Sequence, residues 1–117
     1  MRCMTLEKWT SELRECGKAA VVDWTRIDML WRQLAAEAER IASSVAPGAF
    51  CTAQEWDQRI DCTIKLSDGK IVGEMILLSE VTVQRVEETA ERLRRRLAGE
   101  NVPLMNELWP PIRIISS

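Results

Sequence analysis

The spacing of apolar residues changes once along this chain of 117 residues, and that change most constrains the fold. From Trp24 to Val45 apolar side chains recur every three or four positions, which predicts an amphipathic helix covering a core. From Ile60 to Leu66 they recur at every second position, the period of a half-exposed β-strand. The chain therefore combines helix with sheet.

The predicted strand is followed by Asp68-Gly69, and an Asp-Gly pair between alternating apolar runs is typical of a tight β-hairpin. With these two residues as the loop, Cys62 faces Met75 on the returning strand, which we expect from Ile71 to Leu78. The returning strand is apolar on both faces. This pattern predicts a strand that is central in the sheet or covered on its second face.

The same two periods predict the remaining elements. We expect helices from Thr5 to Cys16 and from near Ser79 to the residue before Gly99. Phe50 to Trp56 is a candidate first strand, and Ile112–Ile115 is a candidate last strand. The expected architecture is a single two-layer α+β domain over residues 1–117, in the order α-α-β-β-β-α-β. Its antiparallel or mixed sheet has three or four strands packed by helices.

Composition indicates a small soluble protein of the cytoplasm. Apolar residues make up 46% and charged residues 29%, as in globular proteins. The net charge of −2 gives no overall attraction to nucleic acid or to anionic lipid. The N-terminus lacks the apolar run of a secretory signal, and no stretch is long and apolar enough to span a bilayer.

The four cysteines, Cys3, Cys16, Cys51 and Cys62, form no CxxC motif, and the chain has no histidine to complete a zinc site. We therefore expect no metal and no cofactor. Cys51 and Cys62 could meet across paired strands. Because cytoplasmic thiols are kept reduced, we expect buried free thiols rather than disulfides.

Catalytic residues are sparse. The absence of histidine removes the commonest general base and the usual partner of a serine or cysteine nucleophile, and tyrosine is absent too. Carboxylates remain: Asp57, Asp61 and Glu74 could cluster on the polar face of the hairpin as the site of a small carboxylate-based enzyme. A solvated strand face explains them as well, and we expect no enzyme.

The second alternative function is nucleic-acid binding. Arg92, Arg94, Arg95 and Arg96 cover most of a turn near the end of the third predicted helix and could contact phosphates. Acidic residues fill the front half of that helix, so the same order complements the helix dipole without a ligand. We consider nucleic acid an unfavoured partner.

The leading hypothesis for the function rests on the tryptophans. The chain has five tryptophans, a residue type enriched at interface anchors, and a long helical seam that one small sheet can cover only in part. We expect a non-enzymatic protein-binding or adaptor domain that associates with itself, as a dimer, or with another protein. The candidate interface residues lie on apolar helix and strand faces: Trp24, Trp31, Val72, Ile76, Leu78 and Trp109.

Two resemblances accompany this hypothesis. In size and composition alone, the chain resembles small acidic secretion chaperones and immunity or inhibitor proteins of bacteria and their viruses. The predicted α-β-β-β-α core resembles that of double-stranded RNA-binding domains. However, Ser79-Glu80-Val81-Thr82 stands where those domains have a basic helix start, and this departure argues against RNA binding.

Overall fold

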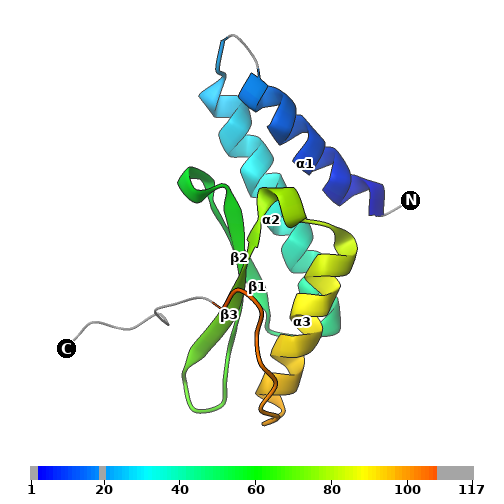
Figure 1. The fold of residues 1–117 in the computed structure, drawn as a ribbon, viewed down its shortest axis with the longest axis vertical. Helices are drawn as coiled ribbons and strands as arrows, with labels where there is room; N and C mark the ends of the chain where they lie inside the picture. The colour runs from blue at the N-terminus through cyan, green and yellow to red at the C-terminus, as the bar shows by residue number, and fades with distance from the viewer. Residues whose placement is uncertain (1–2, 19–20, 108–117) are drawn as a thin grey trace, which may run out of the picture.

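The computed structural model describes residues 3–18 and 21–107 (Figure 1). Two helices precede three strands, and a third helix follows them, so the expected α+β fold is confirmed over this range. The elements are α1 (Cys3–Lys18), α2 (Trp24–Val45), β1 (Phe50–Gln54), β2 (Arg59–Lys65), β3 (Ile71–Leu77) and α3 (Val83–Leu97), with short 3-10 turns η1 (Glu55–Asp57) and η2 (Leu78–Glu80). The expected strand Ile112–Ile115 lies outside the described residues.

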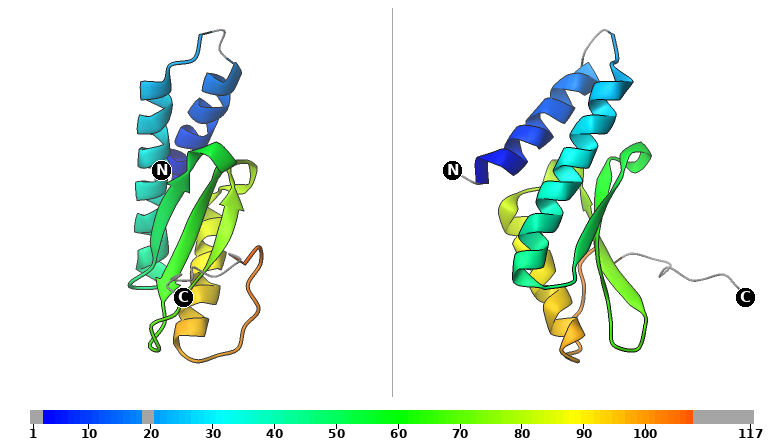
Figure 2. Two further views of the ribbon diagram at one scale, coloured as in Figure 1. Left: turned by 90° about the vertical axis from the view of Figure 1, so that its left-hand side faces the viewer. Right: turned by 180° about the vertical axis from the view of Figure 1, so that it is seen from behind.

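The molecule has two layers (Figure 2). The strands form one antiparallel sheet in the order β1-β2-β3. Helix α2 lies mainly over β1 and helix α3 over β2 and β3, while α1 packs against α2. The part from α2 to α3 thus has the α-β-β-β-α order expected from the sequence. Within the described ranges, no helix has the length and apolar character needed to cross a membrane.

Helix α2 begins and ends where the sequence predicts. The Asp23 carboxylate accepts a hydrogen bond from the Arg26 N–H and so caps the first turn. Pro47 follows the last turn, and Gly48 has a φ of +98°, a value that glycine adopts without strain. The residues at three-four spacing face the core: Leu30, Trp31, Leu34, Ala35, Ala38, Ile41 and Ala42.

The hairpin at Asp68-Gly69 forms, but its loop is one residue longer than predicted. Leu66 N–H donates to Lys70 O at 2.7 Å, and Gly69, at a φ of +91°, closes a three-residue loop. The register therefore pairs Cys62 with Glu74 rather than with Met75. The predicted pairing is wrong by one position, and a one-residue slip exchanges the two faces of a strand.

Helix α3 starts later than expected. The turn η2 occupies Leu78–Glu80, and the Thr82 hydroxyl then caps α3 by accepting a hydrogen bond from Arg85 N–H. Beyond α3 the chain returns along the free edge of β3, where Met75 N–H donates to Asn106 O at 2.9 Å. This return places the segment before residue 108 next to Glu74.

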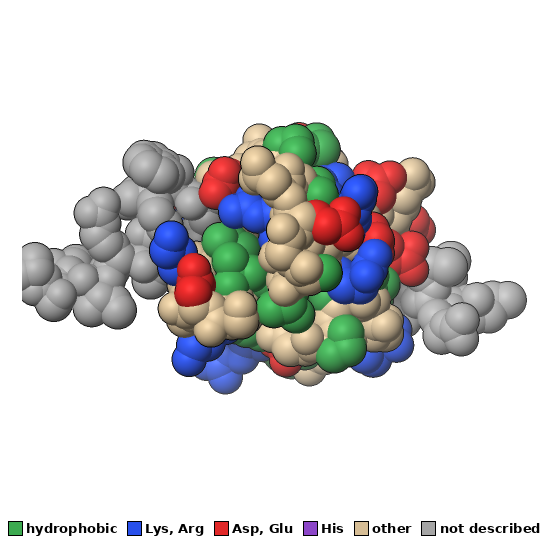
Figure 3. Space-filling view, turned by 90° about the horizontal axis from the view of Figure 1, so that it is seen from below, with side chains coloured by type: hydrophobic (Ala, Val, Ile, Leu, Met, Phe, Trp, Pro, Cys, Tyr) green, Lys and Arg blue, Asp and Glu red, His purple; other side chains and the backbone are tan. Residues whose placement is uncertain are grey.

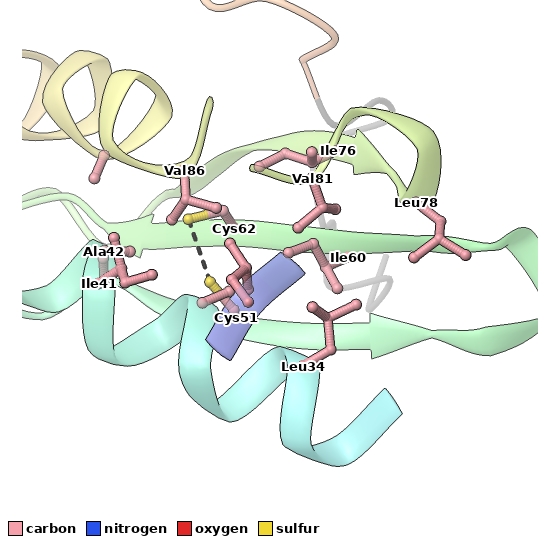
Figure 4. Packing of buried hydrophobic residues seen from close by; sticks show 14 of the residues in the cluster. Leu34, Ile41, Ala42, Cys51, Ile60, Cys62, Ile76, Leu78, Val81 and Val86 are labelled. Carbon is pink, nitrogen blue, oxygen red and sulfur yellow. Dashed lines mark hydrogen bonds between the residues drawn. The ribbon is translucent and has the colours of Figure 1, made fainter. Parts of the chain in front are cut away.

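The core lies between the sheet and the helices (Figure 4). Leu34 and Ile41 of α2 and Val86 of α3 meet the strand side chains that point to the helical side. Among those strand residues, Cys51 and Cys62 are register partners, and their sulfur atoms lie 3.4 Å apart as free thiols. These two cysteines thus meet across paired strands, as the sequence allowed.

Candidate binding cleft

A cleft of about 690 Å³ opens where the α1–α2 end meets the connection between β1 and β2. Its volume is in the range of pockets that hold small molecules or anchoring side chains of a partner. We call it the tryptophan cleft. It is lined by Leu13, Arg14, Cys16, Gly17, Lys18, Val22, Trp24, Ile27, Trp31, Glu55, Trp56, Gln58 and Leu78.

Two indole rings stand at this cleft in contact with solvent. Trp24 at the start of α2 is 64% exposed, and Trp56 in η1 is 91% exposed. Their ring centroids are 6.1 Å apart with planes inclined by 34°, a favourable tilted aromatic arrangement. Indoles left so exposed contribute little to the core of a free monomer, so their burial is available to a partner.

The β1–β2 connection holds Trp56 in this position. It forms the turn η1, and Gln58 closes the turn in the left-handed conformation with φ 54°, which is uncommon for a residue other than glycine. Gln58 O accepts a hydrogen bond from Leu78 N–H at 2.9 Å, so η1 is tied to the end of β3. Trp56 is thus presented by a fixed turn.

The floor of the cleft belongs to the core. Trp31 is buried, and Leu78 and Leu13 are nearly so. An occupant would contact the apolar side chains of α1, α2 and η2 at its inner end and the two exposed indoles at its outer end. The lining of the cleft is therefore largely apolar and includes both core residues and exposed indoles.

Charged side chains stand at the edges. Arg14 and Lys18, one turn apart on α1, are exposed at one wall. At the other wall, a hydrogen bond with Asp28 and partial desolvation raise the pKa of Glu55. Asp28 itself is paired with Arg32 at 3.0 Å. Within the described ranges, Arg14 and Lys18 have no ion-pair partner, although Arg14 Nη2 donates to Leu78 O at 3.4 Å. The positive charge that an occupant could pair with is therefore on the α1 side.

A search with the sequence found no matching family model, curated protein or solved structure.

The structure brings together three of the six predicted interface residues: Trp24, Trp31 and Leu78 all line the cleft. Val72 is half-buried, and Ile76 is completely buried, because both point to the helix-covered face of β3. Ile76 is thus a core residue that a partner could not contact. Trp109 lies outside the described residues.

Trp56 is the most exposed tryptophan of the cleft, and the sequence hypothesis left it out. It follows a short strand and belongs to no apolar period, so periodicity gave no reason to select it. Its exposure could have been inferred from the sequence around it. A tryptophan in the polar run Gln54-Glu55-Trp56-Asp57-Gln58 has few neighbours that could bury it.

The arginine cluster is engaged within the chain. Arg92 binds Glu74, Arg94 pairs with Glu91, Arg95 pairs with Glu100 at 2.9 Å, and Arg96 donates to Val102 O at 3.2 Å. Seen from the end where α3 finishes, basic and acidic side chains are interspersed (Figure 3). Phosphate contacts from this helix would have to displace existing acceptors, which disfavours nucleic-acid binding there.

The three candidate carboxylates do not converge. Asp57 and Asp61 both lie beside Arg59, at 3.4 and 2.9 Å, and Asp61 is on the sheet face away from the helices. Glu74 lies on the opposite face, because the shifted register directs it under α3. No described group of three or more Asp, Glu, Cys or His side chains is arranged to hold a metal ion.

Proposed function

We propose that this chain is a small non-enzymatic protein-binding domain that contacts its partner through the tryptophan cleft. One observation carries the proposal: Trp24 and Trp56, in contact with each other, remain 64% and 91% exposed above an apolar floor. Tryptophan dominates interface energetics because it buries a large apolar area at little cost in side-chain entropy.

The chemistry of the cleft favours an apolar anchor with an acidic flank. The inner lining of Leu13, Ile27 and Leu78 accepts aliphatic or aromatic groups. Arg14 and Lys18 at the edge favour negative charge beside that anchor. A segment of a protein chain, possessing both features at fixed spacing, satisfies this surface better than a small polar metabolite.

Panning of a random peptide display library on the full chain tests the proposal. The same library is counter-selected on a Trp24→Ala/Trp56→Ala variant, which should fold because both side chains are largely exposed. Leu97→Ala, an exposed apolar residue near the end of α3, is the matched control. We expect enriched peptides with an apolar anchor and acidic neighbours that bind the native chain and Leu97→Ala equally.

Binding of these peptides to the double variant should be weaker by roughly tenfold or more, as expected when an aromatic anchor is removed. Peptides that bind the double variant as well as the native chain, or a library without any enrichment, would contradict the proposal. Circular dichroism of all three proteins shows whether the helix content is unchanged.

A further inference from the structure

A second hollow, of about 470 Å³, lies at the same end of the molecule as the tryptophan cleft. Cys16 of α1 lines both the hollow and the cleft, so the two surfaces lie next to each other. We call this second surface the acidic hollow. It is lined by Glu12, Glu15, Cys16, Val21, Asp23 and Arg26.

The two surfaces have opposite charge. The acidic hollow has three carboxylates and one guanidinium, and that guanidinium, on Arg26, is already paired with Glu12 at 2.7 Å. The tryptophan cleft has two cationic side chains, Arg14 and Lys18, and one carboxylate, whose pKa is raised. Each surface therefore has the charge that the other lacks.

Val21 adds an apolar projection to the acidic hollow. It is 82% exposed in the α1–α2 connection, and its neighbour Val22 lines the tryptophan cleft. An apolar side chain with acidic neighbours is the chemistry that the cleft favours. The chain thus presents on one end both a receptor surface and a ligand for it.

We infer that the partner of the tryptophan cleft is a second copy of this chain, related by a two-fold axis near the α1–α2 end. This inference rests on the proposed function and names its partner. In such an isologous contact, Val21 and the acidic hollow of each copy face Trp24, Trp56, Arg14 and Lys18 of the other. The acidic hollow and the tryptophan cleft lie next to each other on one end of the chain. A two-fold axis near that end therefore brings the hollow of each copy to the cleft of the other, and both contacts form together.

Sedimentation equilibrium of the full chain across micromolar to submillimolar concentrations tests the inference. We expect a monomer–dimer equilibrium for the native chain and for Leu97→Ala. Val21→Ser and Trp56→Ala should each weaken dimerisation by roughly tenfold or more, since each removes apolar burial from both symmetric contacts without adding a charge. All three positions are exposed, so the variants keep the fold.

Charge exchange gives the sharper test. One variant has Arg14→Glu with Lys18→Glu, and the other has Glu12→Lys with Glu15→Lys. Each should be monomeric alone, because like charges then face each other in both contacts. Mixed in equal amounts, the two should form a heterodimer, because opposite charges are restored across both contacts.

A native chain that stays monomeric throughout the concentration range overturns the inference. So does a dimer that is unaffected by Val21→Ser, or a mixture of the two charge variants without heterodimer. Failure of the dimer can be distinguished from failure of the proposed function. If peptides selected by panning still require Trp56 for binding, the cleft binds a protein other than a second copy.

Discussion

Arg92 and Glu74 form a two-point ion pair between α3 and β3, with Nε–Oε2 at 2.6 Å and Nη2–Oε1 at 2.9 Å. The Glu74 side chain is 0% exposed. Its carboxylate also accepts hydrogen bonds from Arg85 Nη1, from the Thr89 hydroxyl and from Met105 N–H. One buried carboxylate therefore joins the sheet, helix α3 and the segment that returns along β3.

Removal of this charge should destabilise the fold strongly. Glu74→Gln removes the carboxylate that both Arg85 and Arg92 bind, and loss of one partner of a buried pair costs about 3–5 kcal/mol. Urea denaturation measures the change in the free energy of unfolding. Glu91→Gln, which breaks the exposed pair with Arg94 on the same helix, should change it little.

The same carboxylate predicts an acid-sensitive fold. Burial by itself raises the pKa of Glu74, but hydrogen bonds from Arg92, Arg85 and the Met105 N–H outweigh it and hold this pKa below the ordinary value. Because the pKa of Glu74 is lower in the folded chain than in the unfolded chain, its ionised form stabilises the fold. This stabilisation is complete at pH values above the unfolded pKa of about 4.3, and it is lost as the pH falls through the folded pKa. Unfolding free energies measured from neutral pH downward should decline over that range.

The decline should be smaller in Glu74→Gln, which has no carboxyl group to protonate at this position. An identical pH dependence in the native chain and in the variant would show that other carboxylates control acid stability.

Gly73 occupies a position in β3 that has no room for a side chain. A methyl group there would come within 2.4 Å of Cys62 O and 2.5 Å of Thr63 Cγ2, and the first of these is backbone. Gly73→Ala should therefore lower the free energy of unfolding by about 1–3 kcal/mol, as overpacking does. Gly17→Ala is the control, because its added methyl group meets nothing within 4 Å and favours helix α1.

Cys51 and Cys62 should join on treatment with diamide. Cys51 N–H donates to Glu39 rather than to β2, so the two cysteines form a non-hydrogen-bonded pair, the arrangement that brings side chains closest. Two thiols lose two hydrogen atoms to diamide, which becomes the hydrazine, and one disulfide forms. Peptide mapping by mass spectrometry identifies the bond, and the closed loop should stabilise the fold by roughly 2–3 kcal/mol.

This oxidation should be slow at neutral pH. The hydrogen bond with Cys62 and burial raise the pKa of the Cys51 thiol, and the thiolate is the reactive form. Cys16, which lines the open cleft, should react with a thiol-alkylating reagent before Cys51, and Cys51 should follow only under partial denaturation. Faster alkylation of Cys51 than of Cys16 would contradict the buried thiol pair.

The elements with strong local signals were predictable. Helix α2 has both a regular apolar period and a capping residue, and the hairpin has its Asp-Gly pair. The loop length was not predictable, because Gly69 is compatible with two-residue and three-residue loops that differ only in the pairing of Leu66 with Lys70. The loop length fixes the register of β2 against β3, and the register decides which face Glu74 occupies.

The cleft was predictable in part. Trp24 and Trp31 follow from the α2 period, but the contact between Trp24 and Trp56 depends on how η1 packs against the start of α2. A contact between residues that distant in the chain leaves no local pattern. The opposite charges on the two sides of the α1–α2 end likewise emerge only when the helices are placed side by side.

The indole N–H signals of the tryptophans test the central claim most directly. In ¹⁵N–¹H spectra of the full chain, either increasing protein concentration or addition of a peptide selected by panning should fill the cleft. We predict that the signals of Trp24 and Trp56 shift together, while that of Trp9 on α1, which does not line the cleft, stays in place. If partner binding shifts other signals and leaves Trp24 and Trp56 unchanged, the tryptophan cleft is not the binding surface.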